Sequence, residues 1–167
     1  MKPGFPPFFR AIFILLLGGL LAACQSTPKA NGFTPAQVAT LKQEGFVPAT
    51  EDDWMLTLPD RLLFPSDQSE MSPEKLAEIA QLAKALIRVN IMTAVVEGHT
   101  DSTASDAYNL RLSQARARTV AGPMITAGMR FSPEQIVGKG KAFPISSNET
   151  AEGRRDNRRV VIIVSPM

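Results

Sequence analysis

Few side chains in this sequence could perform catalytic chemistry. It has one histidine, His99, and one cysteine, Cys24. A hydrolase needs an acid and a base held as a pair, a metal site or an activated nucleophile. The spacing of Glu97 and Asp101 does not mark such a pair, and a histidine beside a strand end is more often a hydrogen-bonded structural residue than a catalyst. We therefore expect a binding protein and not an enzyme, with no cofactor and no metal.

The N-terminus has the pattern of a secretory signal. Lys2 and Arg10 supply positive charge, an apolar run follows, and Leu-Ala-Ala-Cys closes the segment. The apolar run, of about 11 to 13 residues, is too short for a membrane-spanning helix, which needs about 20. We expect residues 1–23 to be removed on export.

Cys24 stands directly after the predicted cleavage site. A single cysteine forms no internal disulfide. Its position resembles the lipobox of bacterial lipoproteins, and this resemblance implies lipidation at Cys24, with several acyl chains giving a durable hold on a bilayer. An aspartate after the cysteine resembles the usual inner-membrane retention signal, so Gln25 favours the outer membrane, with the domain facing the periplasm.

Loss of the signal changes the charge balance. The whole chain has 18 basic and 16 acidic residues, and removing Lys2 and Arg10 leaves 16 of each. A formally neutral protein has no general electrostatic attraction to nucleic acid or anionic lipid. Removing 23 of 167 residues leaves 144, which is enough for one domain with one core.

The mature sequence divides into three parts. Residues 24–32 are small and polar and predict a short lipidated tether. Residues 33–54 predict a helix and an extended segment. Residues 55–167 alternate between strand-like and helix-like patterns and predict the main domain.

Three helices are predicted. Two begin after a residue that could cap them, Thr34 and Ser72, and a proline follows each of these; the third starts near Ser105. Apolar residues then recur at helical spacing, and Gly45 ends the first helix.

Four segments are predicted to be strands, two of them rich in β-branched residues. They are Trp54–Leu58, Met92–Glu97, Gln135–Gly138 and Arg159–Val164. Their order with the helices predicts an α+β two-layer sandwich.

Two separated motifs lie in the main domain. The first starts with Gly98-His99-Thr100-Asp101 and continues through Asn109, Leu112-Ser113 and Arg116-Ala117, and the second is Asn157-Arg158-Arg159-Val160. Together they resemble the peptidoglycan-associating domain shared by the C-terminal part of OmpA, by Pal and by the stator protein MotB. The resemblance covers roughly Leu56 to Val164. It implies a mixed β-sheet with helices on one face, and non-covalent binding of peptidoglycan.

The same resemblance implies a ligand and its contacts. Diaminopimelate in the stem peptide has an ammonium and a carboxylate on one stereocentre. Asp101 matches the family residue that accepts from the ammonium, and Arg116 matches the one whose guanidinium takes the carboxylate through two parallel hydrogen bonds. A lysine-type stem peptide lacks that carboxylate and would leave Arg116 unpaired. Thr103 matches a position that adds a contact, and Asp67 stands where many relatives have asparagine.

A second departure from the family is Gly122-Pro123, where relatives usually run on as an unbroken helix. Because Pro123 removes an internal hydrogen bond, we expect it to kink or split the helix near Thr119.

Four arginines gather near the end of the sequence, at Arg154, Arg155, Arg158 and Arg159. A nucleic-acid patch is one interpretation, but an exported neutral protein rarely meets nucleic acid. We expect these residues to brace the fold through partners such as Glu152 and Asp156.

The segment before the main domain resembles the YfiB subfamily of lipoproteins. The residues that carry this resemblance are Phe33-Thr34-Pro35, Gln37-Val38-Ala39, Gly45-Phe46, Asp53-Trp54 and Leu62-Leu63-Phe64. In that subfamily the lipoprotein acts with a soluble periplasmic repressor, YfiR, and an inner-membrane diguanylate cyclase, YfiN. The resemblance implies a sensor that sequesters a YfiR-like repressor and so regulates cyclic-di-GMP synthesis. The alternative is a structural tether of the Pal kind between outer membrane and cell wall.

The tether limits how far the domain can reach. Residues 24–32, fully extended, cover at most about 30 Å. One hypothesis is that the segment 33–49 packs on the domain at rest and is released for binding, with Phe46 and Trp54 as apolar anchors. The alternative is that these aromatic residues simply complete the core.

Overall fold

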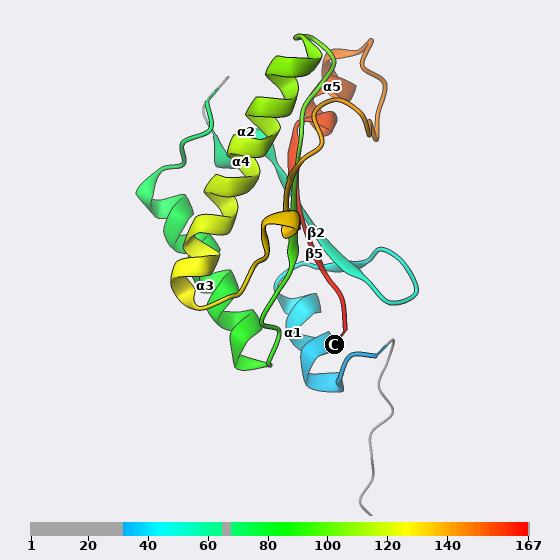
Figure 1. Cartoon of the computed structure of the whole chain (residues 1–167). Coiled ribbons are helices and arrows are strands. Elements are labelled where there is room, and N and C mark those ends of the chain that lie inside the picture. Colours follow the sequence, from blue (N-terminus) through cyan, green and yellow to red (C-terminus); the bar gives the residue numbers. More distant parts are fainter. Residues whose placement is uncertain (1–31, 65–67, 167) are drawn as a thin grey trace, which may run out of the picture.

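The computed structural model describes residues 32–64 and 68–166. A five-stranded mixed sheet lies at its centre (Figure 1). The strands are β1 (Val47–Pro48), β2 (Trp54–Pro59), β3 (Val95–His99), β4 (Ile136–Gly138) and β5 (Arg159–Val164), in the order β1-β2-β5-β3-β4. β3 and β4 are parallel, and the other neighbours are antiparallel.

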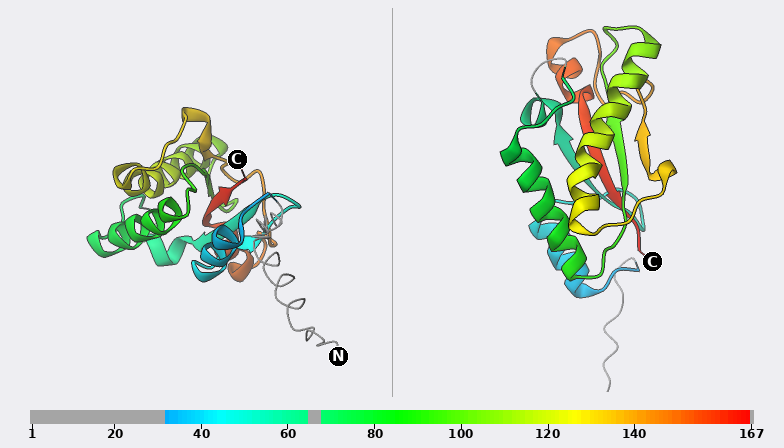
Figure 2. Two further views of the ribbon diagram at one scale, coloured as in Figure 1. Left: turned by 90° about the horizontal axis from the view of Figure 1, so that it is seen from below. Right: turned by 60° about the vertical axis from the view of Figure 1, so that its left-hand side comes forward.

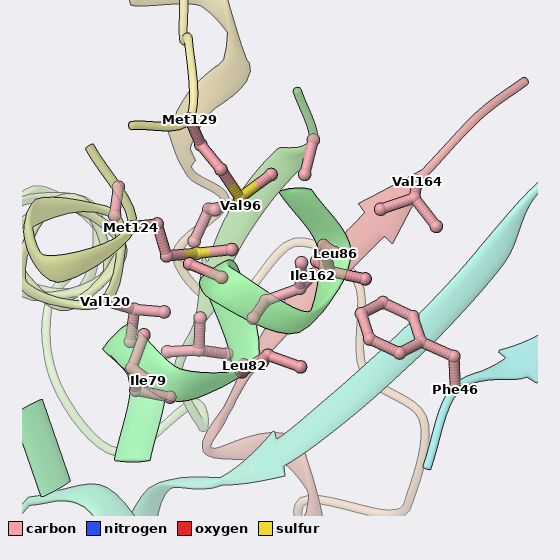
Figure 3. Close-up of a cluster of buried hydrophobic side chains, with 14 of the residues drawn as sticks. Phe46, Ile79, Leu82, Leu86, Val96, Val120, Met124, Met129, Ile162 and Val164 are labelled. Atoms are coloured by element: carbon pink, nitrogen blue, oxygen red, sulfur yellow. The ribbon is translucent and has the colours of Figure 1, made fainter. Parts of the chain in front are cut away.

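Two long helices, α3 (Pro73–Arg88) and α4 (Asp106–Ala127), cover one face of this sheet (Figures 1 and 2). Helix α1 (Pro35–Gln43) packs against α3, and α2 (Asp60–Leu63), η1 (Pro133–Gln135) and α5 (Ala151–Asn157) are short connecting turns. The core lies between the helices and the sheet, where Figure 3 shows Ile79, Leu82 and Leu86 of α3, Val120 and Met124 of α4, and Val96, Ile162 and Val164 of the strands. This architecture confirms the predicted α+β sandwich with a mixed sheet.

The predicted N-caps Thr34 and Ser72 are confirmed, and Ser105 caps the helix that was predicted to start near it. The side-chain oxygens of Thr34, Ser72 and Ser105 each accept a hydrogen bond from the backbone N–H three residues later, at 3.3, 3.4 and 3.3 Å. Such bonds satisfy one of the N–H groups that a helix leaves without a partner at its start.

The segment before the main domain is part of the common core. Phe33, Leu41 and Phe46 are at most 2% exposed and belong to the same apolar cluster as the sheet. Gln37 adds a polar contact, because its Nε2 donates to the carbonyl of Val89 at 3.0 Å. In the conformation described here these residues complete the core, and their release stays a prediction.

The second strand begins later than predicted. Ile91 is buried but its N–H donates to the carbonyl of Leu86 as α3 ends, and the carbonyl of Met92 accepts from Arg130. The β-branched run therefore first closes a helix and joins the sheet only at Val95. β1 and α5 were not predicted, because such short segments give little periodic pattern.

The expected split of the second helix is wrong. α4 runs without interruption from Asp106 to Ala127, with Pro123 inside it. Proline removes a single N–H donor, and the neighbouring Val120, Ala121 and Met124 are fully buried in the core. Tertiary packing on both sides of Pro123 thus keeps the helix continuous.

Several predicted features lie outside the described residues. These are the signal sequence, Cys24 with most of the tether, and the candidate site residue Asp67. Within the part that is described, no helix has the length and apolar character needed to cross a membrane.

Candidate functional site

Three strand ends meet at one edge of the sheet, next to α2 and α5 (Figure 1). Asp60 directly follows β2, and Arg158 directly precedes β5. The antiparallel register pairs Pro59 with Arg159, so Asp60 and Arg158, just beyond this pair, face one another. The N–H of Asp60 donates to the carbonyl of Arg158 at 3.0 Å. Asp101 lies two residues beyond the end of β3 at the same edge.

A chain of ion pairs connects these residues with helix α4. Arg158 Nη1 lies 2.6 Å from Asp101 Oδ2, and Arg158 Nε lies 3.6 Å from Asp60 Oδ2. The other Asp60 oxygen, Oδ1, lies 3.2 Å from Arg116 Nη2. We call Asp101, Arg158, Asp60 and Arg116 the edge network. Its two carboxylates and two guanidinium groups alternate, so their formal charges cancel.

Asp101 is held rigidly within the edge network. Its Oδ1 accepts from the backbone N–H of Thr103 at 3.0 Å and from the Thr103 hydroxyl at 2.6 Å. Asn109 holds the loop by donating to the carbonyls of Asp101 and Ala104, both at 3.1 Å. Burial raises the pKa of Asp101, but the hydrogen bonds from Thr103 and the charge of Arg158 outweigh it, so the pKa lies below its usual value. The site therefore presents an ionised carboxylate.

The two arginines of the edge network differ in exposure. Arg116 is 1% exposed, its Nε donates to the carbonyl of Gln68 at 3.0 Å, and its guanidinium carbon lies 5.2 Å from the centre of the Phe64 ring. The Arg158 side chain is 34% exposed. The sequence-predicted pair of Asp101 and Arg116 is thus brought into one network, but Asp60 and Arg158 lie between its members.

Glycine lets α4 approach the sheet closely enough to bring Arg116 to this edge. A Cβ on Gly98 would collide with the backbone carbonyl of Ser113, and one on Gly138 would meet the backbone of Gln114 at 2.5 Å. Gln114 and Ser113 then tie the helix to the sheet edge, donating to Ile136 and accepting from Gly140.

Sequence reasoning missed Asp60 and underestimated Arg158. A signal was present, because both residues border predicted strands, and an antiparallel pairing of those strands would have placed them opposite one another. The expected bracing role of the arginines holds, but the expected partners were wrong. Arg154 donates to the carbonyls of Asn148 and Glu149, Arg155 donates to that of Ala151, and Arg159 donates to those of Asn157 and Phe143.

A second charged cluster lies on the sheet face away from α3 and α4. Glu97 Oε1 is 3.1 Å from Lys139 Nζ, and Glu97 Oε2 is 3.6 Å from Nε2 of the buried His99. The contact with His99, helped by the charge of Lys139, lowers the pKa of Glu97 despite its partial burial. These residues border a groove of about 300 Å³ whose apolar lining includes Val161 and Phe143. In residues 32–64 and 68–166, no group of three or more His, Cys, Asp or Glu side chains is arranged to hold a metal ion.

Comparisons with known proteins agree with this fold. Residues 63–158 match the OmpA family. The outer-membrane lipoprotein YfiB of Pseudomonas aeruginosa is 36% identical over 154 residues, which cover 92% of this chain and 90% of that protein. The putative lipoprotein YfiB of Escherichia coli K12 is 38% identical over 147 residues, or 87% of this chain and 90% of that one.

Among solved structures, the cell wall anchor of the T6SS from Pseudomonas aeruginosa is similar, with a TM-score of 0.61 and 29% identity. The match covers 79% of this chain and 95% of that one. The relationship to YfiB lipoproteins confirms the predicted outer-membrane localisation. The chain belongs to the OmpA family, and over most of its length it is related to the YfiB lipoproteins.

Proposed function

We propose that this protein is an outer-membrane lipoprotein, anchored through Cys24, that binds peptidoglycan non-covalently at the edge network. The observation that carries the proposal is the ionised Asp101 carboxylate, fixed by Thr103 and placed 2.6 Å from a guanidinium. A solved protein of similar fold is named as a cell wall anchor, which supports the same function.

The ligand that suits this arrangement is the diaminopimelate stem peptide. Its free stereocentre carries an ammonium and a carboxylate close together, and the edge network offers an anion beside cations at matching spacing. Asp101 accepts from the ammonium, while Thr103 holds Asp101 in place. Arg116 is required for binding, and its charge is balanced by Asp60. A neutral network does not attract ions in general, so its selectivity comes from geometry.

The test is titration of the mature lipoprotein, kept in detergent, with a diaminopimelate stem peptide. We expect Asp101→Ala and Arg116→Ala each to abolish measurable binding while circular dichroism reports an intact fold. Binding that survives in both variants would exclude the edge network as the site. Purified sacculi that stay undegraded during the assay would fit binding without catalysis.

We further propose a regulatory role, in which the lipoprotein sequesters a YfiR-like periplasmic repressor and thereby controls a diguanylate cyclase. The support is that both YfiB relatives match over about nine-tenths of this chain, which includes the segment of α1 and β1. That segment is fixed to the core through Leu41 and Phe46, and its release would change both the reach of the tether and the exposed surface.

Leu41→Ala and Lys42→Ala form a matched pair for this proposal. Leu41 is fully buried and Lys42, its neighbour on α1, is exposed. We expect Leu41→Ala to loosen the segment and to change capture of the purified repressor by the lipoprotein, and Lys42→Ala to leave it as in the unmodified chain. If neither variant alters capture, or if the repressor is never captured, a structural tether of the Pal kind is the better description.

A further inference from the structure

We infer that the groove on the sheet face away from α3 and α4 is a second binding site, which takes a small amphipathic anion with an apolar body and one acidic group. We call it the open-face groove (Figure 1). None of the four residues of the edge network lines it. The inference therefore goes beyond the proposed function and does not depend on it.

The floor of the open-face groove is an apolar strip across two strands. Met55 of β2 pairs with Ile163 of β5, and Thr57 pairs with Val161, so their side chains lie on the same face of the sheet. The solvated face of an antiparallel sheet usually carries polar residues. The strip is instead mostly apolar, and it offers a surface that an apolar ligand body would cover.

One wall of the groove is a loop whose backbone is fixed while its apolar side chains stay in solvent. Phe143 and Ile145 are 60% and 61% exposed. Arg159 donates to the carbonyl of Phe143 at 3.1 Å. The N–H of Ile145 donates to the fully buried Asn157 at 2.8 Å. The wall is thus formed before any ligand arrives, as is usual for small-molecule sites.

The polar end of the groove carries more positive than negative charge. Lys139 and Arg159 are two cations, and Glu97 is the single carboxylate among the lining residues. Glu97 pairs with Lys139 at 3.1 Å, and the terminal nitrogens of Arg159 donate to backbone carbonyls. Burial lowers the pKa of Arg159, and the charge of Glu97 offsets this only in part. An anionic ligand would supply the missing negative charge.

Two further contacts at this end point to a ligand. Lys139 is 30% exposed, and its Nζ lies 5.4 Å from the centre of the Phe143 ring, so the apolar wall and an accessible cation adjoin. His99 is 4% exposed and borders the groove, and its Nδ1 has no hydrogen-bond partner among the described residues. Such buried atoms are rare in native proteins, and a polar group of a ligand at this end would satisfy it.

Two dyes test the inference. They are anilinonaphthalene sulfonate and N-phenylnaphthylamine, which is the same molecule without the sulfonate. Each is titrated by fluorescence into the mature chain carrying Cys24→Ser, so that no lipid or detergent competes for the dye. We expect one dye molecule per chain, and binding of the sulfonate about tenfold tighter because of one charge-assisted contact.

Four variants assign the binding to the groove, with circular dichroism to check each fold. Phe143→Ala should weaken both dyes about threefold to tenfold, because it removes the aromatic wall. Lys139→Met should weaken only the sulfonate. Glu97→Gln should tighten the sulfonate about threefold, a gain that a damaged fold cannot produce. Ile125→Ala is the control, because Ile125 is 48% exposed on α4 and should not affect either dye.

The inference is overturned if the unmodified chain binds neither dye, or if Phe143→Ala and Glu97→Gln both leave the affinity for the sulfonate unchanged. Equal binding of the two dyes would also overturn it, because the groove would then not select an acid. A diaminopimelate stem peptide should not displace the sulfonate. Displacement would mean that the two sites are one, and the inference of a second site would fail.

Discussion

The two charged clusters of this protein both combine acidic and basic side chains, but they differ in how deeply these side chains are buried. In the edge network, two aspartates at most 7% exposed sit among arginines supplied by α4 and by the residue before β5. In the cluster on the open face, Glu97 sits between Lys139 and His99, and the carboxylate and the lysine stay 20% and 30% exposed. Removing one partner of a buried ion pair strongly lowers the free energy of unfolding, whereas an exposed ion pair contributes little to it. The edge network is therefore both a candidate binding site and a set of contacts that stabilises the fold.

Asp60→Ala should have the largest effect. It removes the carboxylate that separates two guanidinium groups and leaves the buried Arg116 facing a like charge across the gap. We expect a loss of about 3 kcal/mol or more in the free energy of unfolding, measured by urea denaturation. Asp106→Ala is the control, because its pair with Lys141 is exposed and should contribute less than about 0.5 kcal/mol. Equal effects of the two changes would mean that burial does not make the edge network more important for stability than an exposed ion pair.

Asp101→Asn should show an intermediate effect that depends on pH. The folded pKa of Asp101 is lowered, so its ionised form stabilises the fold fully above the unfolded pKa of about 3.9, and this contribution disappears as the pH falls through the folded pKa. The unmodified chain should be the more stable of the two at pH 7, and the difference should shrink below about pH 4. Unfolding measured across this range checks the sign, and a difference that grows on acidification would contradict it.

Glu97→Gln should have the smallest effect. It keeps the shape of the side chain and a hydrogen-bond acceptor near His99 and Lys139, and it removes only a partly exposed charge. We expect a loss below about 1 kcal/mol that falls further in high salt, because exposed pairs are screened. Thermal unfolding in low and high salt measures it. A loss as large as that of Asp60→Ala would show that the second charged cluster stabilises the fold as much as the edge network does.

Local features of the fold were predictable from sequence. Thr34 and Ser72 cap helices where the sequence placed them, because a cap depends on only a few neighbouring residues. The last strand, Arg159–Val164, was also placed correctly, because a run of β-branched residues favours a buried strand. Pro123 shows the limit of local reasoning, since packing at Val120 and Met124 outweighed its helix-breaking tendency.

The candidate site was less predictable, because it depends on strand order and register. Asp101 and Arg116 were identified through a family resemblance, which does not reveal that Asp60 and Arg158 lie between them. Those two residues are separated by 98 positions in the chain, and they meet only because β2 and β5 are antiparallel neighbours. No property of either residue alone predicts that contact.

The first described residue and the last strand end lie together, far from the edge network. A Cβ on Gly32 would lie 2.8 Å from Pro166, and Figure 1 shows this end of the molecule opposite to α5. If the tether pulls at Gly32 while the cell wall holds the edge network, tension runs lengthwise along the sheet. The six residue pairs of β2 and β5 are then loaded in shear, all at once, and do not unzip one after another. A domain mounted in this direction would resist mechanical load better than its thermodynamic stability alone suggests.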